Sequence, residues 1–263
     1  MNELLSNKTI FITGASSGLG REIAIEVSKC GATIILCARR EEKLYEVKLE
    51  CEKLSKKKVY YYVGNLSNEQ DIEKICNDID KKFEKIDILV NNAGFGKFDD
   101  VSNLDMNEAK EMFNVNTLAV IRFCNFFTKK MKELKSGHII NIASQGGKMA
   151  FPEGSVYSAT KFATYGFSNA MRLELHQYNI FVTTVNPGPM NTGFFDAAES
   201  VRDYVDKAKF ITLDPNKLAK KIVKNMCKNK REINSPLVLE VCAKIYALFP
   251  SFGDFLARKI FGK

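Results

Sequence analysis

The sequence predicts an α/β fold: one doubly wound parallel sheet of about seven strands, with helices on both faces and a helical C-terminal extension. Two observations carry this prediction. Short apolar runs rich in β-branched residues alternate with helical patterns along most of the chain. The first of these runs leads directly into a glycine-rich turn, Gly14 to Gly20, that opens a helix. No repeat or linker divides the 263 residues, so we expect one domain over 1–263.

The expected strands are bounded by turn residues and are short. They span 9–12, 33–37, 59–63, 88–90, 138–142 and 181–185, with an edge strand at 232–234. Helical periodicity fills the intervals between them. The expected helices are one that follows the glycine turn and ends at Gly31, then 41–55, 69–84, 107–133, the helix that carries Tyr157 and Lys161, 215–228 and 237–249.

The charge of +8 is concentrated in the C-terminal fifth of the chain. Residues 217–263 contain eleven Lys and Arg against three acidic residues, whereas residues 1–216 balance. This distribution, without a nucleic-acid motif, argues against a nucleic-acid partner. Seven cysteines without a Cys-x-x-Cys pair, and only two histidines, make a disulfide framework or a zinc site unexpected. The N-terminus lacks a signal-like pattern, and we expect a cytoplasmic protein.

Tyr157 and Lys161 lie four residues apart, and Ser144 precedes the tyrosine by thirteen residues. Residues four apart share one face of a helix, so the ammonium can lie beside the phenol. A nearby cation lowers the pKa of a phenol and would let Tyr157 act as a general acid or base. Ser144 could hydrogen-bond the substrate oxygen. Alone, this spacing is also typical of an ordinary pair on a helix surface.

The glycine turn reads Gly-x-x-x-Gly-x-Gly and follows the first strand, which is the context of a dinucleotide-binding turn. An acidic residue at the end of the second strand would select NAD. Here Ala38 is followed by Arg39 and Arg40, which suit the 2′-phosphate of NADP(H). The alternative is that these arginines only begin the solvated helix with Glu41 and Glu42.

Several motifs in order resemble the short-chain dehydrogenase/reductase family, from about Lys8 to Thr192. They are Thr13 to Gly20, Asn91-Asn92-Ala93-Gly94, Asn116, Ser144, Tyr157-x3-Lys161, and Pro187 to Thr192. The resemblance implies a Rossmann-like fold and a catalytic tetrad of Asn116, Ser144, Tyr157 and Lys161. In this family, hydride passes between the nicotinamide and a carbonyl carbon while the tyrosine protonates the oxygen. Lys161 would also bind the nicotinamide ribose, and Asn116 would hold a water that links Lys161 to solvent.

The turn, the arginine pair and the resemblance together predict the cofactor contacts. Thr192 would meet the nicotinamide carboxamide. The predicted cofactor-binding residues are Gly14, Ser16, Ser17, Gly18, Leu19, Gly20, Arg39, Arg40, Asn65, Leu66, Asn92, Ala93, Gly94, Tyr157, Lys161, Pro187, Gly188, Met190 and Thr192. Two departures from the family pattern are notable. Asn65 stands where many relatives have Asp, and Ser17 stands where some NADPH-using relatives have a basic residue.

Aromatic and methionine side chains around the predicted cleft indicate an apolar substrate pocket. They are Phe95, Phe98, Met149, Phe151, Met190, Phe194 and Phe195, with Lys97 and Lys148 as the conspicuous cations, so a small carboxylate substrate is not favoured. Residues 193–212 are expected to form a substrate lid. Residues 235–263 form a basic amphipathic extension that suits a flap over the cleft, a subunit contact or a peripheral membrane segment. We favour packing on protein over membrane contact.

The sequence therefore predicts an NADPH-dependent oxidoreductase that interconverts a lipophilic ketone or aldehyde and an alcohol, with an oxoacyl or hydroxysteroid-like compound as substrate. A catalytically silent NADP(H)-binding sensor or scaffold is the alternative from another class. An epimerase or dehydratase would also use Tyr-x3-Lys, but the glycine spacing and the lack of a large C-terminal substrate domain argue against it. The resemblance further implies a homodimer or homotetramer through the helices of residues 107–133 and 155–177.

Overall fold

Seven parallel strands form one sheet in the order β3-β2-β1-β4-β5-β6-β7 in the computed structural model, which describes residues 2–190 and 212–261. The predicted doubly wound α/β fold is thereby confirmed. The strands are β1 (Thr9–Thr13), β2 (Thr33–Ala38), β3 (Tyr60–Val63), β4 (Ile88–Asn91), β5 (Gly137–Ile142), β6 (Ile180–Pro187) and β7 (Glu232–Ser235). The expected lid over 193–212 lies outside the described residues except for Thr212.

The strand order reverses beside β1. Phe11 of β1 pairs with Ile35 of β2 on one side and with Leu89 of β4 on the other. The chain builds outward from β1 to β3 first, then outward from β4 to β7. Because all strands are parallel, their carboxyl ends share one edge, and the loops separate at the reversal. This geometry places the predicted cofactor turn and the predicted catalytic residues at the same edge.

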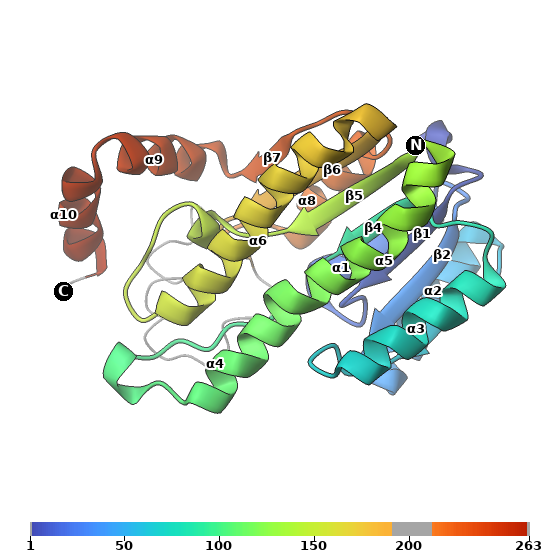
Figure 1. Ribbon diagram of the computed structural model, residues 1–263, viewed down its shortest axis with the longest axis horizontal. Coiled ribbons are helices and arrows are strands. Elements are labelled where there is room, and N and C mark those ends of the chain that lie inside the picture. The colour runs from blue at the N-terminus through green and yellow to red at the C-terminus, as the bar shows by residue number, and fades with distance from the viewer. Residues whose placement is uncertain (1, 191–211, 262–263) are drawn as a thin grey trace.

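Helices cover both faces of the sheet (Figure 1). One layer contains α1 (Gly18–Ser28), α2 (Glu41–Ser55) and α8 (Pro215–Asn225). The other contains α3 (Glu69–Lys82), α5 (Ala119–Leu134) and α6 (Ser155–Leu175). Short 3-10 helical turns lie between these elements or before β1: η1 (Glu3–Leu5), η2 (Val101–Asn103), η4 (Gln145–Gly147) and η5 (His176–Tyr178).

The two faces of β1 show why the strands read as continuous apolar runs. Ile10 and Ile12 join the core beneath α1, α2 and α8, whereas Phe11 points into the opposite core. There its ring meets Phe123 and Phe127 of α5 edge to face, with centroids 5.4 and 5.7 Å apart. Burying a side chain of this size contributes about 1.5–3 kcal/mol, so both layers depend on alternation along the strand.

The helix expected over 107–133 is interrupted. It consists of α4 (Met106–Phe113), the π-helical turn η3 (Asn114–Leu118) and α5. The wider turn coincides with buried polar contacts that a regular apolar helix would not make. Asn116 Nδ2 donates to Phe95 O at 2.8 Å, and Thr117 Oγ1 donates to Thr160 O at 3.0 Å. A π-helical turn within a helix often marks a functional position.

The C-terminal region also differs from the expected helices. Helix α8 ends at Asn225, three residues earlier than expected, and Cys227 adopts a left-handed backbone with φ of 62°. The helix expected over 237–249 ends at Leu248, just before Pro250, but the proline is followed by a further helix that was not expected. Pro250 begins α10 (Pro250–Phe261) directly after α9 (Leu237–Leu248), because proline is tolerated in the first turn of a helix.

Helices α9 and α10 extend past the end of β7 to one side of the sheet (Figure 1). We call Leu237–Phe261 the C-terminal arm. Helix α9 contacts β7 and η4, and α10 contacts α9. None of the helices within 2–190 and 212–261 has the length and hydropathy that crossing a bilayer would require.

His138 joins β5, β6 and the segment before β7 in the buried interior. Its Nε2 lies 2.9 Å from Thr183 Oγ1, and its Nδ1 accepts from the Cys227 N–H at 3.1 Å. Because Thr183 Oγ1 already donates to Lys230 O at 2.5 Å, Nε2 carries the ring proton. Burial lowers the pKa of His138 to about 4. The folded chain therefore holds this imidazole neutral.

Acid should destabilise the chain through His138. Below pH 6.5 the unfolded chain gains a proton that the folded chain does not take up until about pH 4. Urea unfolding should show that the free energy of unfolding falls between pH 7 and pH 4 by about 3 kcal/mol more in the wild type than in His138→Gln. Equal losses in the two proteins would contradict this assignment.

Candidate active site

The glycine turn between β1 and α1 forms a narrow cradle at the carboxyl edge. Gly14 and Gly18 have φ of 65° and 54°, a conformation that favours glycine. A Cβ at Gly14 would lie 2.7 Å from Ala93 Cα. Asn92 Nδ2 donates to Thr13 O and Gly14 O at 3.0 and 3.2 Å, which fixes the turn against the end of β4. A pyrophosphate at this position would meet the N-terminus of α1.

Two arginines follow β2 at one side of this cradle. The Arg40 guanidinium donates to Ser16 Oγ at 3.1 Å and to Ser17 Oγ at 2.6 Å. Arg39 reaches across to Glu111 Oε1 at 3.3 Å and remains more than half exposed. Some NADPH-using relatives have a basic residue at the position of Ser17. In this chain the guanidinium of Arg40, from the segment after β2, binds Ser17 instead. Two cations and two hydroxyls could bind a phosphate there.

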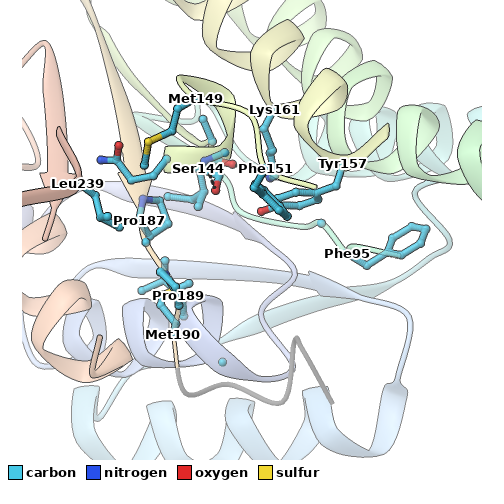
Figure 2. A pocket seen from close by; sticks show the side chains of 18 of the residues that line it. Phe95, Ser144, Met149, Phe151, Tyr157, Lys161, Pro187, Pro189, Met190 and Leu239 are labelled. Carbon is cyan, nitrogen blue, oxygen red and sulfur yellow. Dashed lines mark hydrogen bonds between the residues drawn. The ribbon is translucent and has the colours of Figure 1, made fainter. Parts of the chain in front are cut away.

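Three of the predicted catalytic residues meet beyond the end of β5. Ser144 follows β5, and its Oγ accepts from Gly146 N at 3.0 Å and hydrogen-bonds the Tyr157 phenol. Tyr157 and Lys161 are buried on α6, with Lys161 Nζ 5.8 Å from the centre of the Tyr157 ring. Figure 2 shows Ser144, Tyr157 and Lys161 around one pocket. The predicted clustering is therefore present in the fold.

Asn116 lies beneath these residues and fixes the loop after β4. Its Oδ1 accepts from Phe95 N at 3.0 Å, and its Nδ2 donates to Phe95 O and to Thr160 Oγ1. A Cβ at Gly94 would lie 3.0 Å from Asn116 Oδ1 and 3.3 Å from Lys161 Nζ. The glycine therefore lets the amide and the ammonium share this space. The water expected between Asn116 and Lys161 stays a prediction.

The pKa of Tyr157 moves in the opposite direction from the one expected. Burial raises the pKa of Tyr157 to about 12, and the hydrogen bond with Ser144 opposes this rise only in part. Burial also lowers the pKa of Lys161 to about 8. The lysine donates to Ile142 O at 3.0 Å rather than to the phenol. Desolvation thus outweighs the field of Lys161, and the phenol is fully protonated near neutral pH.

The cradle and the catalytic residues line one cavity of about 870 Å³ (Figure 2). Most predicted cofactor residues line it: Gly14, Ser16, Ser17, Gly18, Leu19, Arg39, Arg40, Leu66, Asn92, Ala93, Gly94, Tyr157, Lys161, Pro187, Gly188 and Met190. Phe95, Met149 and Phe151, which the sequence predicted for an apolar substrate pocket, also line this cavity. One cavity thus has room for a dinucleotide beside an apolar substrate.

Several predicted residues lie elsewhere. Gly20 packs beneath the turn against Gly14 O, and Asn116 is buried behind the wall. Asn65 is exposed and does not line the cavity, and its Oδ1 accepts from Ser67 N at 3.2 Å. Phe98 does not line the cavity, but its ring contacts that of Tyr157 with centroids 5.4 Å apart. Thr192, Phe194 and Phe195 lie outside the described residues.

The C-terminal arm forms a wall of this cavity, as in the flap over the cleft that the sequence left open as one of three alternatives. Leu239, Cys242, Ile245 and Tyr246 of α9 line it, together with Phe252 and Leu256 of α10. Their spacing along α9 is that of one helix face, which indicated an amphipathic helix but not its partner. A Cβ at Gly188 would lie 2.7 Å from Leu239 Cδ1, so this glycine lets α9 approach the end of β6.

Buried ion pairs connect the C-terminal arm to the loop between β5 and α6, residues 143–154, which we call the catalytic loop. Lys148, four residues after Ser144, lies 2.6 Å from Glu232 Oε2 of β7 and 2.6 Å from Glu240 Oε2 of α9. Although burial opposes it, hydrogen bonding to both carboxylates raises the pKa of Lys148. Lys97 likewise pairs with Glu108 at 3.0 Å. Both cations named for the pocket are therefore paired with protein carboxylates, which agrees with an apolar substrate.

Sequence comparison shows the family. Residues 8–203 match the short-chain dehydrogenase family, and the chain belongs to it. The 11-beta-hydroxysteroid dehydrogenase-like protein 4A of Arabidopsis thaliana is 30% identical over 253 residues, which cover 95% of this chain and 83% of that protein. The 3-ketodihydrosphingosine reductase of Bos taurus is 33% identical over 226 residues, covering 82% and 67%. The predicted family is thereby confirmed.

Solved structures show the same fold. A short-chain dehydrogenase from Sphingobium yanoikuyae in complex with NADPH superposes with a TM-score of 0.81 at 24% identity and covers 95% of each chain. An alcohol dehydrogenase from the archaeon Thermococcus sibiricus, complexed with 5-hydroxy-NADP, has a TM-score of 0.76 at 25% identity, covering 86% of this chain and 94% of that one. The chain therefore shares the fold of these two proteins.

The lowered pKa of Lys161 predicts how cofactor binding responds to pH. The Lys161 side chain is a charged ammonium below about pH 8, and it loses its proton and its charge as the pH rises through that value. If this charge binds the cofactor, the dissociation constant for the nicotinamide dinucleotide should increase severalfold between pH 7 and pH 9.5, as measured by fluorescence titration. Lys161→Met should bind weakly and with little pH dependence. A wild-type constant unchanged over this range would contradict the assignment.

Proposed function

We propose that this chain is an NADPH-dependent oxidoreductase that reduces a lipophilic ketone or aldehyde to the alcohol, with Tyr157 as the proton donor. The observation that carries this proposal is the assembly of Ser144, Tyr157 and Lys161 at one wall of the cavity whose other end is the glycine cradle. The reaction type follows from the family to which the chain belongs.

The choice of NADP(H) is supported by the end of β2. Ala38 offers no carboxylate to a ribose 2′-hydroxyl, whereas Arg40, Ser16 and Ser17 form a hydrogen-bonded group beside the turn. A 2′-phosphate could take the place of the two hydroxyls as the acceptor of the guanidinium. The NADPH complex of the dehydrogenase from Sphingobium yanoikuyae and the 5-hydroxy-NADP complex of the archaeal alcohol dehydrogenase are consistent with this choice.

The tetrad residues have separate tasks in the proposed reduction. Bound NADPH would supply the hydride. Tyr157, with its pKa raised to about 12, keeps its proton until a developing oxyanion can accept it. Ser144 accepts from the Gly146 N–H and hydrogen-bonds the Tyr157 phenol, and its hydroxyl would turn to donate to the substrate oxygen. Lys161 supplies positive charge below about pH 8, and Asn116 holds Phe95 and α6 in place.

The raised pKa of the phenol also bears on direction. Reduction consumes a proton, which the neutral Tyr157 can give at once. Alcohol oxidation would first require the phenolate, whose formation near pH 7 is disfavoured by about five pKa units in the cofactor-free chain. We therefore infer that the rate of alcohol oxidation rises with pH relative to the rate of reduction, while the substrates and cofactors themselves set the equilibrium.

A lipophilic substrate is supported by the walls beside Tyr157. Phe151 and Met149 of the catalytic loop face Leu239 and Pro187 across the cavity (Figure 2). Lys148 is paired with carboxylates, so it offers no free charge to a carboxylate substrate. The relatives named for a hydroxysteroid and for a ketosphingolipid suggest a long or polycyclic ketone.

The alternative of a silent NADP(H)-binding sensor or scaffold is disfavoured by the site. A binding protein needs the cradle but has no need for a buried tyrosine joined to Ser144 above a buried lysine. Burying these groups costs free energy that a merely structural helix would avoid. We retain the expected cytoplasmic location and a homodimer or homotetramer through α5 and α6 as further proposals.

Removing the phenolic hydroxyl tests the mechanism. Tyr157→Phe should lower kcat for reduction of a long-chain ketone by about 10²- to 10⁴-fold, because the proton donor is lost. Its dissociation constant for NADPH should stay close to that of the wild type. Tyr178→Phe, a tyrosine remote from the cavity, should leave both quantities unchanged. A Tyr157→Phe protein with most of the original kcat would refute the proposed mechanism.

The cofactor preference can be tested at Arg39 and Arg40. Each change to Ala should raise the Michaelis constant for NADPH while leaving that for NADH almost unchanged. Because each variant would lose a charge-assisted hydrogen bond to the 2′-phosphate, its Michaelis constant for NADPH should rise about tenfold to a hundredfold. The double variant should use the two cofactors with similar efficiency. Arg122→Ala, on α5, provides the control. A wild-type preference for NADH, or an unaltered ratio in the double variant, would overturn the choice of NADPH.

A further inference from the structure

The C-terminal arm has a second apolar face that the cavity does not use. Leu237, Val238, Val241 and Leu248 of α9 are between 52% and 73% exposed. Phe249, between the two helices, and Phe255 of α10 are 62% and 55% exposed. None of these six lines the cavity. We call these six residues the outer face of the arm.

Both faces of α9 are therefore apolar, which a helix packed on one protein layer does not require. The inner face, represented by Leu239, Cys242 and Ile245, is accounted for by the cavity wall. The outer face lies on a part of the molecule that extends away from the sheet and its helices (Figure 1). Six large apolar side chains exposed together on one extension indicate an interaction surface.

The charges of the arm indicate which kind of partner fits. Its two acidic residues are engaged within the chain: Glu240 binds Lys148, and Asp254 accepts from Tyr246 OH at 2.9 Å. Lys244 is 74% exposed, and the carboxylate nearest to it, 4.0 Å away, is Glu240, which Lys148 already binds. Arg258 and Lys259 are exposed at the end of α10. Apolar side chains bordered by available cations are typical of helices that bind anionic lipid surfaces.

A second copy of the chain fits this face less well. Two outer faces brought together would oppose Lys244, Arg258 and Lys259 with the same cations. Of the two carboxylates on the arm, Glu240 is already bound by Lys148, which leaves the exposed Asp254 against three cations among the described residues of the arm. A bilayer offers apolar chains for the six side chains and phosphate groups for the cations.

We propose that the outer face of the C-terminal arm docks this protein on an anionic phospholipid surface. The buried bridge from Lys148 to Glu232 and Glu240 holds the arm, so the docked residues and the cavity wall belong to one element that is fixed to the catalytic loop. The docking does not depend on the reaction proposed above. If that reaction is correct, docking would bring the cavity close to lipophilic substrate dissolved in the membrane.

Vesicle flotation of the full-length protein tests the docking. The wild type should float with vesicles of phosphatidylcholine and phosphatidylserine, and float less with phosphatidylcholine alone or in about 0.5 M salt. The triple variant Val241→Ser, Phe249→Ser, Phe255→Ser should lose at least about tenfold in vesicle affinity. Lys244→Gln with Arg258→Gln should lose affinity for the anionic vesicles only.

Matched controls separate docking from misfolding and from catalysis. Val101→Ser changes an apolar side chain in η2 that is 71% exposed, and it should float like the wild type. The triple variant should keep the wild-type melting temperature and its kcat on a short, water-soluble ketone. Tyr157→Phe should float normally, so a failure of the proposed reaction would leave this result intact. A wild type that stays unbound, or a triple variant that only dissociates an oligomer, would overturn the proposal.

Discussion

The parallel pairing of β1 with both β2 and β4 is the constraint on which the rest of the molecule depends. It brings every strand's carboxyl end to one edge and makes the strand order reverse beside the glycine turn. Asn92 then ties the end of β4 to that turn. The cofactor cradle, the serine after β5 and the arm after β7 come from distant parts of the sequence, yet they share a single cavity for this reason.

Desolvation sets the chemistry inside that cavity. Burial moves the pKa of Tyr157 up and that of Lys161 down, so both groups are pushed toward their neutral forms. Tyr157 therefore keeps its proton and can act as a donor. The pKa of Lys161 is lowered to about 8, so this side chain can lose its charge near that pH. A shared dry environment, rather than attraction between the two groups, determines their starting protonation states. Binding a charged cofactor would alter this balance.

The fold was predictable from the sequence because it depends on local patterns, whereas the tetrad was predicted through the resemblance to the short-chain dehydrogenase/reductase family. Strand runs such as Thr33 to Cys37 and the turn at Gly14 carry their structural meaning within a few residues. The π-helical turn around Asn116 was not predictable, since it reflects contacts with Phe95 and Thr160 from other segments. The pKa of Tyr157 was predicted in the wrong direction because sequence spacing shows a neighbouring cation but not the depth of burial.

What each face of α9 contacts also depends on the tertiary structure, so the sequence alone could not decide between the alternatives for this helix. Glu240 points to the bridge with Lys148, while Leu239 and Cys242 on adjacent turns face the cavity. The side chains that shape the pocket are thus separate from the one that fixes the helix. Substitutions at the cavity positions can change which molecules fit without disturbing the loop that carries Ser144. Substrate range and catalytic geometry are therefore free to evolve independently in this chain, as long as one carboxylate on the arm is retained.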